Sequence, residues 1–196
     1  MWWQSLHDAW WRLATQPQPA SVPDALVCRL LHAGSLAYGA AVSVRNAGYD
    51  RGWRRQVSLP CAVVSVGNLT VGGTGKTTCV ELIARKLAGQ SRRVAVLSRG
   101  YGGSRVSYWL RAGGRGLEID GQPSSQLSGV ADEPQLLAQR LPGIPILVGA
   151  RRERTGRLAC AEFGADAVVL DDGFQHRRVR RDCEIVLVHV RTPMGG

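Results

Sequence analysis

The chain has 196 residues, of which 44% are hydrophobic and 20% charged, a composition typical of a globular protein and unlike that of a disordered one. Its formal net charge is +10, and arginine carries almost all of the positive charge because Lys76 and Lys86 are the only lysines. This surplus indicates an anionic partner, which could be a nucleotide, a nucleic acid or an anionic lipid.

The five cysteines are scattered and form no Cys-x-x-Cys pair, which argues against a zinc site and against a disulfide framework. The first residues lack the basic and apolar regions of a signal peptide. No run of about 18 uncharged apolar residues occurs, so we expect no membrane-spanning helix.

A Trp-rich segment begins the chain. Within residues 1–16, Trp3, Leu6, Trp10 and Leu13 recur at helical spacing. This pattern is typical of a helix at the membrane–water boundary, and equally of a helix that packs onto its own domain. Both interpretations stay open.

A second helix is expected from about Ala25 to Arg45, with Asp24 as its N-cap and an apolar stripe along one side. The basic run from Arg45 to Arg55 follows, with Tyr49 and Trp53 between the arginines. Such a run suits anionic lipid head groups as well as it suits RNA.

The central motif is a short apolar run over residues 63–66, a glycine-rich turn, and Gly75-Lys76-Thr77 at the start of a helix. This order predicts a phosphate-binding loop, in which backbone N–H groups and a helix N-terminus surround phosphate oxygens. Lys76 would reach the β- and γ-phosphates, and the Thr77 hydroxyl would hold Mg²⁺. The residues expected to bind ATP are Thr70, Val71, Gly72, Gly73, Thr74, Gly75, Lys76 and Thr77. The alternative is a glycine-rich turn that binds nothing.

A second buried strand is expected from Arg93 to Ser98, ending in a glycine-rich loop that contains Arg99. Ligands of α/β sheets bind at such strand ends, so Arg99 is either a phosphate contact or a solvated loop arginine. Farther on, Tyr108–Arg111 and Leu117–Asp120 are expected to form a β-hairpin.

Two acidic motifs follow. Asp132 opens a short helix, and its spacing from Gln135 favours a capping role over a catalytic one. An apolar run ends in Asp171 and Asp172. In phosphate-loop proteins such a strand carries the aspartate that orients Mg²⁺, which is the role predicted here. The alternative is a strand that simply ends in an Asp-Asp-Gly turn. His176 is either a loop histidine or part of this site.

Four segments occur in the order and spacing of tetraacyldisaccharide 4′-kinase, the lipid A kinase: Ser65–Thr77, Ser98–Gly102, Asp132–Pro134 and Asp171–His176. The chain therefore resembles this family from about residue 25 to about residue 188. The resemblance implies an α/β fold with a mostly parallel sheet of the P-loop NTPase type, carrying a small β-hairpin insertion. The Trp-rich residues 1–16 lie outside the resemblance. With them included, the expected domains are N-terminal amphipathic, membrane-interface helices over residues 1–55 and a P-loop kinase domain over residues 56–196.

The resemblance also implies a bacterial enzyme at the cytoplasmic face of the inner membrane. It would transfer the γ-phosphoryl group of ATP, with Mg²⁺, to the 4′-hydroxyl of tetraacyldisaccharide 1-phosphate, giving lipid IV-A. Asp132 matches the aspartate that acts on the hydroxyl, and Asp171, Asp172 and His176 match the Mg²⁺/ATP segment. The remaining candidate site residues are Asn68, Arg99 and Tyr101. An anionic membrane surface is the expected partner, and no nucleic acid is expected.

Two departures from the family stand out. Thr78 follows Gly-Lys-Thr where the family usually has proline, and family members continue into a second domain after the last strand expected here. Because that domain closes the nucleotide cleft, we expect little kinase activity from these residues alone. A nucleotide-binding switch without lipid kinase activity is the rival interpretation; no Asn-Lys-x-Asp motif supports guanine binding.

Overall fold

The computed structural model describes residues 22–68, 75–100, 107–113, 116–120, 122–123, 130–174, 176–188 and 190. The predicted Trp-rich helix over residues 1–16, the loop residues 70–74 and Tyr101 lie outside this set. The chain divides into two compact units, Met1–Trp53 and Arg54–Gly196.

The described part of the first unit is one long helix, α2 (Val22–Asp50). It extends past both predicted ends, and Asp24 lies inside its first turn and not at the N-cap. Most of its apolar side chains are exposed, among them Leu26, Leu30 and Val44.

The expectation of no membrane-spanning helix stays a prediction, although one helix of the described residues is long and apolar enough, by length and composition, to cross a membrane. This segment is Leu26–Asp50, with a mean hydropathy of 1.2. No uninterrupted apolar run of that length occurs, but the many Leu, Val and Ala residues outweigh the isolated charge of Arg29 in the average hydropathy.

The second unit is built on an eight-stranded sheet, counted over the described residues, in the order β5-β4-β3-β6-β2-β7-β1-β8. Five strands are parallel: β1 (Ala62–Asn68), β2 (Val94–Ser98), β6 (Ile146–Gly149), β7 (Ala167–Asp171) and β8 (Cys183–Leu187). Three antiparallel strands extend one side: β3 (Ser107–Gly113), β4 (Gly116–Ile119) and β5 (Gln122–Pro123). The mostly parallel α/β fold and the β3–β4 hairpin are therefore confirmed.

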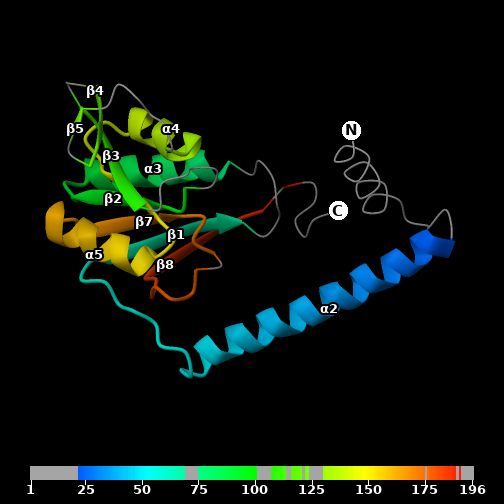
Figure 1. Ribbon diagram of the computed structural model, residues 1–196. Helices are drawn as coiled ribbons and strands as arrows, with labels where there is room; N and C mark the ends of the chain where they lie inside the picture. Colours follow the sequence, from blue (N-terminus) through cyan, green and yellow to red (C-terminus); the bar gives the residue numbers. More distant parts are fainter. Residues whose placement is uncertain are drawn as a thin grey trace, which may run out of the picture. The chain divides into compact units, whose positions relative to one another are not determined.

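Helices cover both faces of this sheet. Figure 1 shows α3 (Lys76–Gly89) and α4 (Asp132–Arg140) on one face and α5 (Arg152–Glu162) on the other. Strand β7 shows why: Ala167 and Val169 join the core beneath α3 and α4, whereas Val168 and Leu170 join the core beneath α5. Burial on both faces explains the uninterrupted apolar runs that predicted the central strands.

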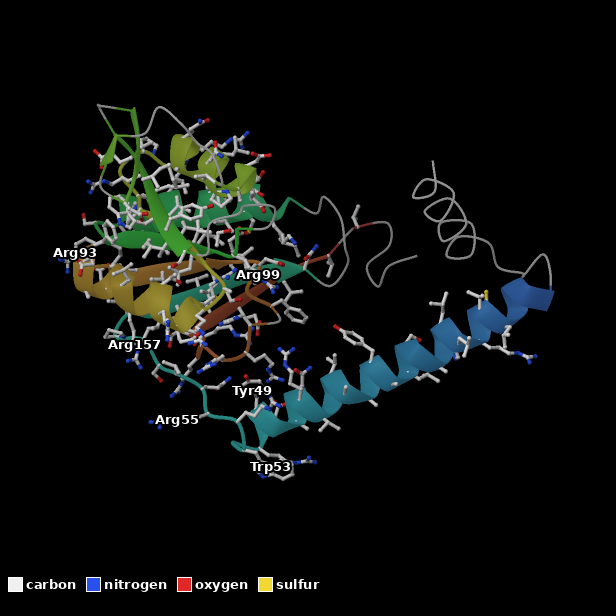
Figure 2. The ribbon with its side chains drawn as sticks, in the orientation of Figure 1. Tyr49, Trp53, Arg55, Arg93, Arg99 and Arg157 are labelled. Atoms are coloured by element: carbon white, nitrogen blue, oxygen red, sulfur yellow. The ribbon has the colours of Figure 1, made fainter. Side chains whose placement is uncertain are left out.

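The carboxyl ends of the parallel strands meet along one edge of the sheet. Arg93 and Arg99, which flank β2, lie at opposite edges (Figure 2). Arg99 therefore marks the edge at which β1 and β7 also end, in Asn68 and Asp171. Ligands of such sheets bind at this edge.

Candidate functional site

The start of α3 has the backbone geometry of a phosphate-binding turn. Gly75 is the N-cap with φ of 79°, a left-handed conformation that glycine adopts without steric cost. Gly75 has no side chain that could cap the helix, so the N-cap residue leaves the first N–H groups of α3 without a side-chain acceptor. Lys76 and Thr77 are the first two residues of the helix.

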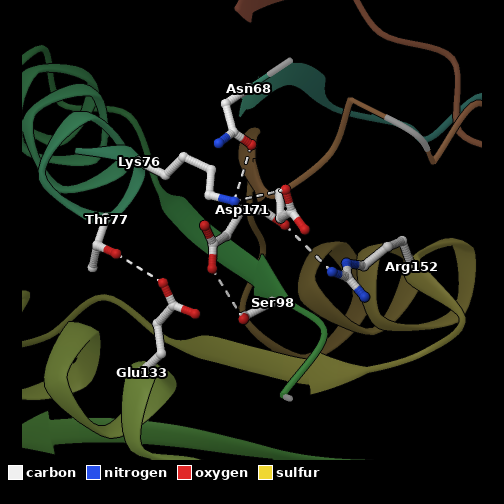
Figure 3. A network of polar contacts seen from close by, with 8 residues as sticks. Asn68, Lys76, Thr77, Ser98, Glu133, Arg152 and Asp171 are labelled. Atoms are coloured by element: carbon white, nitrogen blue, oxygen red, sulfur yellow. Dashed lines mark hydrogen bonds and ion pairs between the residues drawn. The ribbon is translucent and has the colours of Figure 1, made fainter. Parts of the chain in front are cut away.

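Lys76 connects two strand ends. Its Nζ donates to Asn68 Oδ1 at 3.1 Å and pairs with Asp172 Oδ1, also at 3.1 Å (Figure 3). Asn68 ends β1, and Asp172 directly follows β7, with a φ of 52°. The structure thus brings together three residues that the sequence analysis selected separately.

Thr77 contacts a residue that the sequence analysis did not assign to the site. Its hydroxyl donates to Glu133 Oε1 at 2.8 Å, which joins α3 to the first turn of α4 (Figure 3). The available signal was the position of Glu133 beside Asp132 in an acidic helix start.

Asp132 itself is exposed and is the first residue of α4. The N-cap is Ala131, which makes no side-chain capping bond, and Asp132 is the first helical residue, so the favoured capping role for Asp132 is wrong. Gln135 does not form a capping box either. The backbone N–H of the N-cap residue Ala131 donates to Tyr108 Oη at 3.0 Å, and Gln135 Nε2 donates to the backbone oxygen of Val130 at 3.1 Å. Asp132 is thus an exposed carboxylate adjacent to the Thr77 contact.

Asp171 is the buried acid of the site. Ser98 Oγ donates to its Oδ2 at 3.1 Å, while Oδ1 is buried without a hydrogen-bond partner among the described residues. Burial, followed by the charge of Glu133, raises the pKa of Asp171 to about 6. An orphaned carboxylate oxygen with a raised pKa is a position where a cation would be stabilising.

Arg152 is a second residue that the sequence analysis missed. Arg152 stands in an Arg-rich helix start, yet it is only 3% exposed. Its guanidinium donates to the backbone oxygens of Gly149 at 2.7 Å and of Asp171 at 3.3 Å; Figure 3 shows the contact with Asp171. It satisfies carbonyl groups at the ends of β6 and β7, where the ladder hydrogen bonds stop. Arg152 therefore holds the backbone of Asp171 in place.

His176 lies in a different contact group. Its Nε2 is 3.8 Å from Glu153 Oε2, and Arg178 Nε is 3.3 Å from Glu153 Oε1. Burial, followed by the charge of Arg152, lowers the pKa of His176 to about 4, so the ring is neutral at pH 7. The described contacts do not bring His176 to Lys76 or Thr77.

A metal ion at this site would need ligands beyond protein carboxylates. Within the described ranges, no three His, Cys, Asp or Glu side chains lie close enough to hold an ion. Mg²⁺ in phosphate-loop proteins takes a hydroxyl, one or two carboxylates, water and phosphate oxygens. Thr77, Glu133 and the free oxygen of Asp171 supply that donor set.

The family model for tetraacyldisaccharide-1-P 4′-kinase matches residues 27–196. The tetraacyldisaccharide 4′-kinase of Anaeromyxobacter sp. (strain K) is 43% identical over 191 residues, which are 97% of this chain and 48% of that protein. That of Syntrophus aciditrophicus (strain SB) is 49% identical over 168 residues, 85% of this chain and 43% of that protein.

A crystal structure of LpxK from Aquifex aeolicus in complex with ATP is 35% identical, with a TM-score of 0.70, over 81% of this chain and 48% of that chain. The chain therefore spans about half the length of the curated relatives it matches. The match to the family model covers the phosphate loop and both acidic motifs. The chain belongs to the tetraacyldisaccharide-1-P 4′-kinase family.

Proposed function

We propose that this chain binds MgATP and carries the nucleotide half of a tetraacyldisaccharide 4′-kinase. The reaction would move the γ-phosphoryl group of ATP to the 4′-hydroxyl of tetraacyldisaccharide 1-phosphate. The observation that carries the proposal is the convergence of Lys76, Thr77 and Asp171 at one edge of the sheet. Lys76 contacts Asn68 and Asp172, Thr77 contacts Glu133, and Asp171 accepts a hydrogen bond from Ser98. The acceptor is suggested by the names of the relatives.

Lys76 would bind the β- and γ-phosphates. Asn68 and Asp172 hold its ammonium group 3.1 Å from each acceptor, so the long side chain is already ordered at the strand ends. Ordering in advance lowers the entropy cost of binding. When nucleotide binds, phosphate oxygens would accept hydrogen bonds that the Lys76 ammonium group otherwise donates to Asn68 and Asp172.

Thr77, Glu133 and Asp171 would hold Mg²⁺, which neutralises phosphate charge and orients the reacting groups when it is bound. Ser98 and Arg152 act on Asp171, from its side chain and its backbone respectively. With one carboxylate oxygen bound to Ser98, the other is left for the ion. Asp172 is engaged with Lys76, so we assign it to positioning the lysine as well as to the metal shell.

Asp132 would take the proton from the acceptor hydroxyl. Two observations support this role: Asp132 is exposed, and it directly precedes Glu133, a proposed metal contact, at the start of α4. A general base must be within hydrogen-bond reach of the hydroxyl it serves. Arg99, at the same edge of the sheet, is a further candidate for phosphate contact.

Helix α2 would hold the protein at a membrane, where a tetraacylated acceptor resides. Exposed leucines along the helix, including Leu26 and Leu30, provide apolar area, and the Arg45–Arg55 run supplies positive charge. Apolar burial and attraction to anionic lipids act together in such helices. We assign the helix to the cytoplasmic face of the inner membrane.

Calorimetric titration with MgATP tests the nucleotide site, using the chain's only two lysines. Lys76→Ala should weaken binding by about tenfold or more, since it removes charge-assisted hydrogen bonds to phosphate. Lys86→Ala is the matched control, because Lys86 is exposed in the last turn of the same helix. Equal affinity of both variants and the wild type would contradict the proposal.

A further inference from the structure

The first turn of α4 carries both acidic residues that the proposed function assigns to this helix. Asp132 and Glu133 are exposed, whereas Val130 and Ala131, directly before them, are buried. Buried backbone N–H and C=O groups need hydrogen-bond partners. The partners of these two buried residues therefore determine where the first turn of α4 lies.

Tyr108 is the partner of the Ala131 amide. Its hydroxyl oxygen accepts the Ala131 N–H at 3.0 Å, and Tyr108 is itself buried. The neighbouring carbonyl group of Val130 accepts from Gln135 Nε2, which belongs to α4. Of these two bonds, the one from Tyr108 reaches the helix start from another element. It ties the N-cap residue to β3, which lies beside α4 (Figure 1).

The loop after β2 lies close to the same hydroxyl. A Cβ at Gly100 would lie 3.6 Å from the Tyr108 hydroxyl oxygen and 2.3 Å from Val148 Cγ1, and the φ of Gly100 is 77°. Both features favour glycine, which allows this close approach. Arg99, the candidate phosphate contact, directly precedes Gly100. Tyr108 thus lies where β3, the start of α4 and the nucleotide edge of the sheet meet.

A second set of contacts holds the far end of α4. Arg140 pairs with Glu81 of α3 at 3.3 Å, and Arg85 of α3 donates to the backbone oxygen of Arg140 at 2.5 Å. Both arginine side chains are about half exposed, and exposed ion pairs contribute little to stability. Breaking a buried hydrogen bond costs more, because the amide left behind has no water to bind. We therefore expect Tyr108 to be the stronger of the two anchors.

We propose that Tyr108 is a positioning residue of the phosphoryl-transfer site. Its hydroxyl fixes the N-cap of α4, which keeps Glu133 within reach of Thr77 and Asp132 directly beside it. The Thr77–Glu133 contact is 2.8 Å long, so a shift of the helix start by about 1 Å would break it. The inference rests on the proposed function, because it takes Glu133 as a metal contact. Tyr108 acts through these residues and not by touching nucleotide or metal.

Replacing Tyr108 by Phe removes the hydroxyl and keeps the ring in the core. The test is the ATP affinity of the full chain, measured by calorimetry with Mg²⁺ and again in EDTA. With Mg²⁺, Tyr108→Phe should weaken binding about fivefold or more, since Glu133 is no longer held in the metal shell. In EDTA the affinity should not change, because the contacts that order Lys76 come from Asn68 and Asp172 and not from α4.

Amide hydrogen exchange follows the start of α4 directly and needs no nucleotide. The Ala131 N–H should exchange at least about tenfold faster in Tyr108→Phe than in the wild type, because its acceptor is gone. Amides in the middle of α3 should exchange at the wild-type rate, which verifies that the variant is folded.

Two variants control for a general loss of stability. Ile119→Val removes a methylene group from the core cluster that contains Tyr108, and Arg140→Ala breaks the exposed anchor at the far end of α4. Both should keep the wild-type ATP affinity with Mg²⁺. In a Glu133→Gln background, Tyr108→Phe should cause no further loss, because both changes act on one contact.

Several results would overturn the inference. Wild-type exchange of Ala131 in Tyr108→Phe would show that the hydroxyl does not hold the helix start. Unchanged affinity with Mg²⁺, an equal loss in EDTA, or an equal loss in Ile119→Val would leave Tyr108 a purely structural residue. Losses that add in the double variant would separate it from Glu133. Failure of the proposed function has a different signature, since Lys76→Ala would then bind MgATP as the wild type does.

Discussion

Replacing Asp171 by Asn should stabilise the nucleotide-free protein at pH 8, although it removes a proposed metal ligand. Asp171 is 3% exposed, and burial followed by the charge of Glu133 raises its pKa from 3.8 to about 6. A raised pKa means that the folded state favours the protonated carboxyl, so this contribution to stability is present below about pH 4 and is lost as the pH rises through 6. The difference of about two pKa units corresponds to about 3 kcal/mol of unfolding free energy.

Thermal unfolding without nucleotide, followed from pH 8 down to pH 4.5, measures this effect. At pH 8 the Asn variant should melt roughly 6–12 °C above the wild type, the shift that about 3 kcal/mol gives in a domain of this size. The difference should shrink steadily as the pH falls, because the wild-type carboxyl becomes neutral. Glu162→Gln, at an exposed carboxylate in α5, is the control and should show no such trend.

A different pH dependence would refute this reasoning. If the Asn variant were less stable than the wild type at pH 8, the buried charge would be compensated by contacts that the described residues do not show. If the difference did not change with pH, ionisation of Asp171 would not be its source.

Gly173→Ala should lower the unfolding free energy, measured in urea, by about 1–3 kcal/mol, because a Cβ at this position would lie 2.4 Å from Ser65 Oγ. Gly89→Ala is the control, since a Cβ there would meet nothing within 4 Å. Glu133→Gln should weaken ATP binding about tenfold with Mg²⁺ present but not in EDTA; equal loss in both titrations would remove Glu133 from the proposed metal shell. Leu30→Glu should release the chain from anionic vesicles in a sedimentation assay, and unchanged sedimentation would contradict a membrane role for α2.

The parallel sheet and the lysine contact could be predicted because their signals are local. Strands β1 and β7 are short apolar runs, and each is followed by a functional residue: Lys76 at the start of α3, and Asp172 directly after β7. The two strands pair in parallel, with Val66 opposite Asp171, so their carboxyl ends meet. Lys76 and Asp172 can therefore be assigned to one site although 96 residues separate them.

The contacts of Glu133 and Arg152 could not be predicted, because they depend on packing between elements distant in sequence. Glu133 reaches Thr77 only because α4 lies beside α3 on the same face of the sheet. Arg152 stands in an Arg-rich helix start, a pattern that predicts exposure, yet carbonyl groups at two strand ends require its donors. Neither requirement leaves a periodic pattern in the sequence.

The central claim is acceptor-dependent phosphoryl transfer, and a chimera tests it most directly. Residues 1–196 would be joined to the half of the Anaeromyxobacter relative that this chain does not match, and assayed with γ-labelled ATP and tetraacyldisaccharide 1-phosphate. We predict label at the 4′-hydroxyl, and an Asp132→Asn variant with turnover lowered by about 100-fold or more but with nearly unchanged MgATP affinity. A chimera that binds MgATP yet transfers no label, or an Asp132→Asn variant that keeps full turnover, would contradict the account.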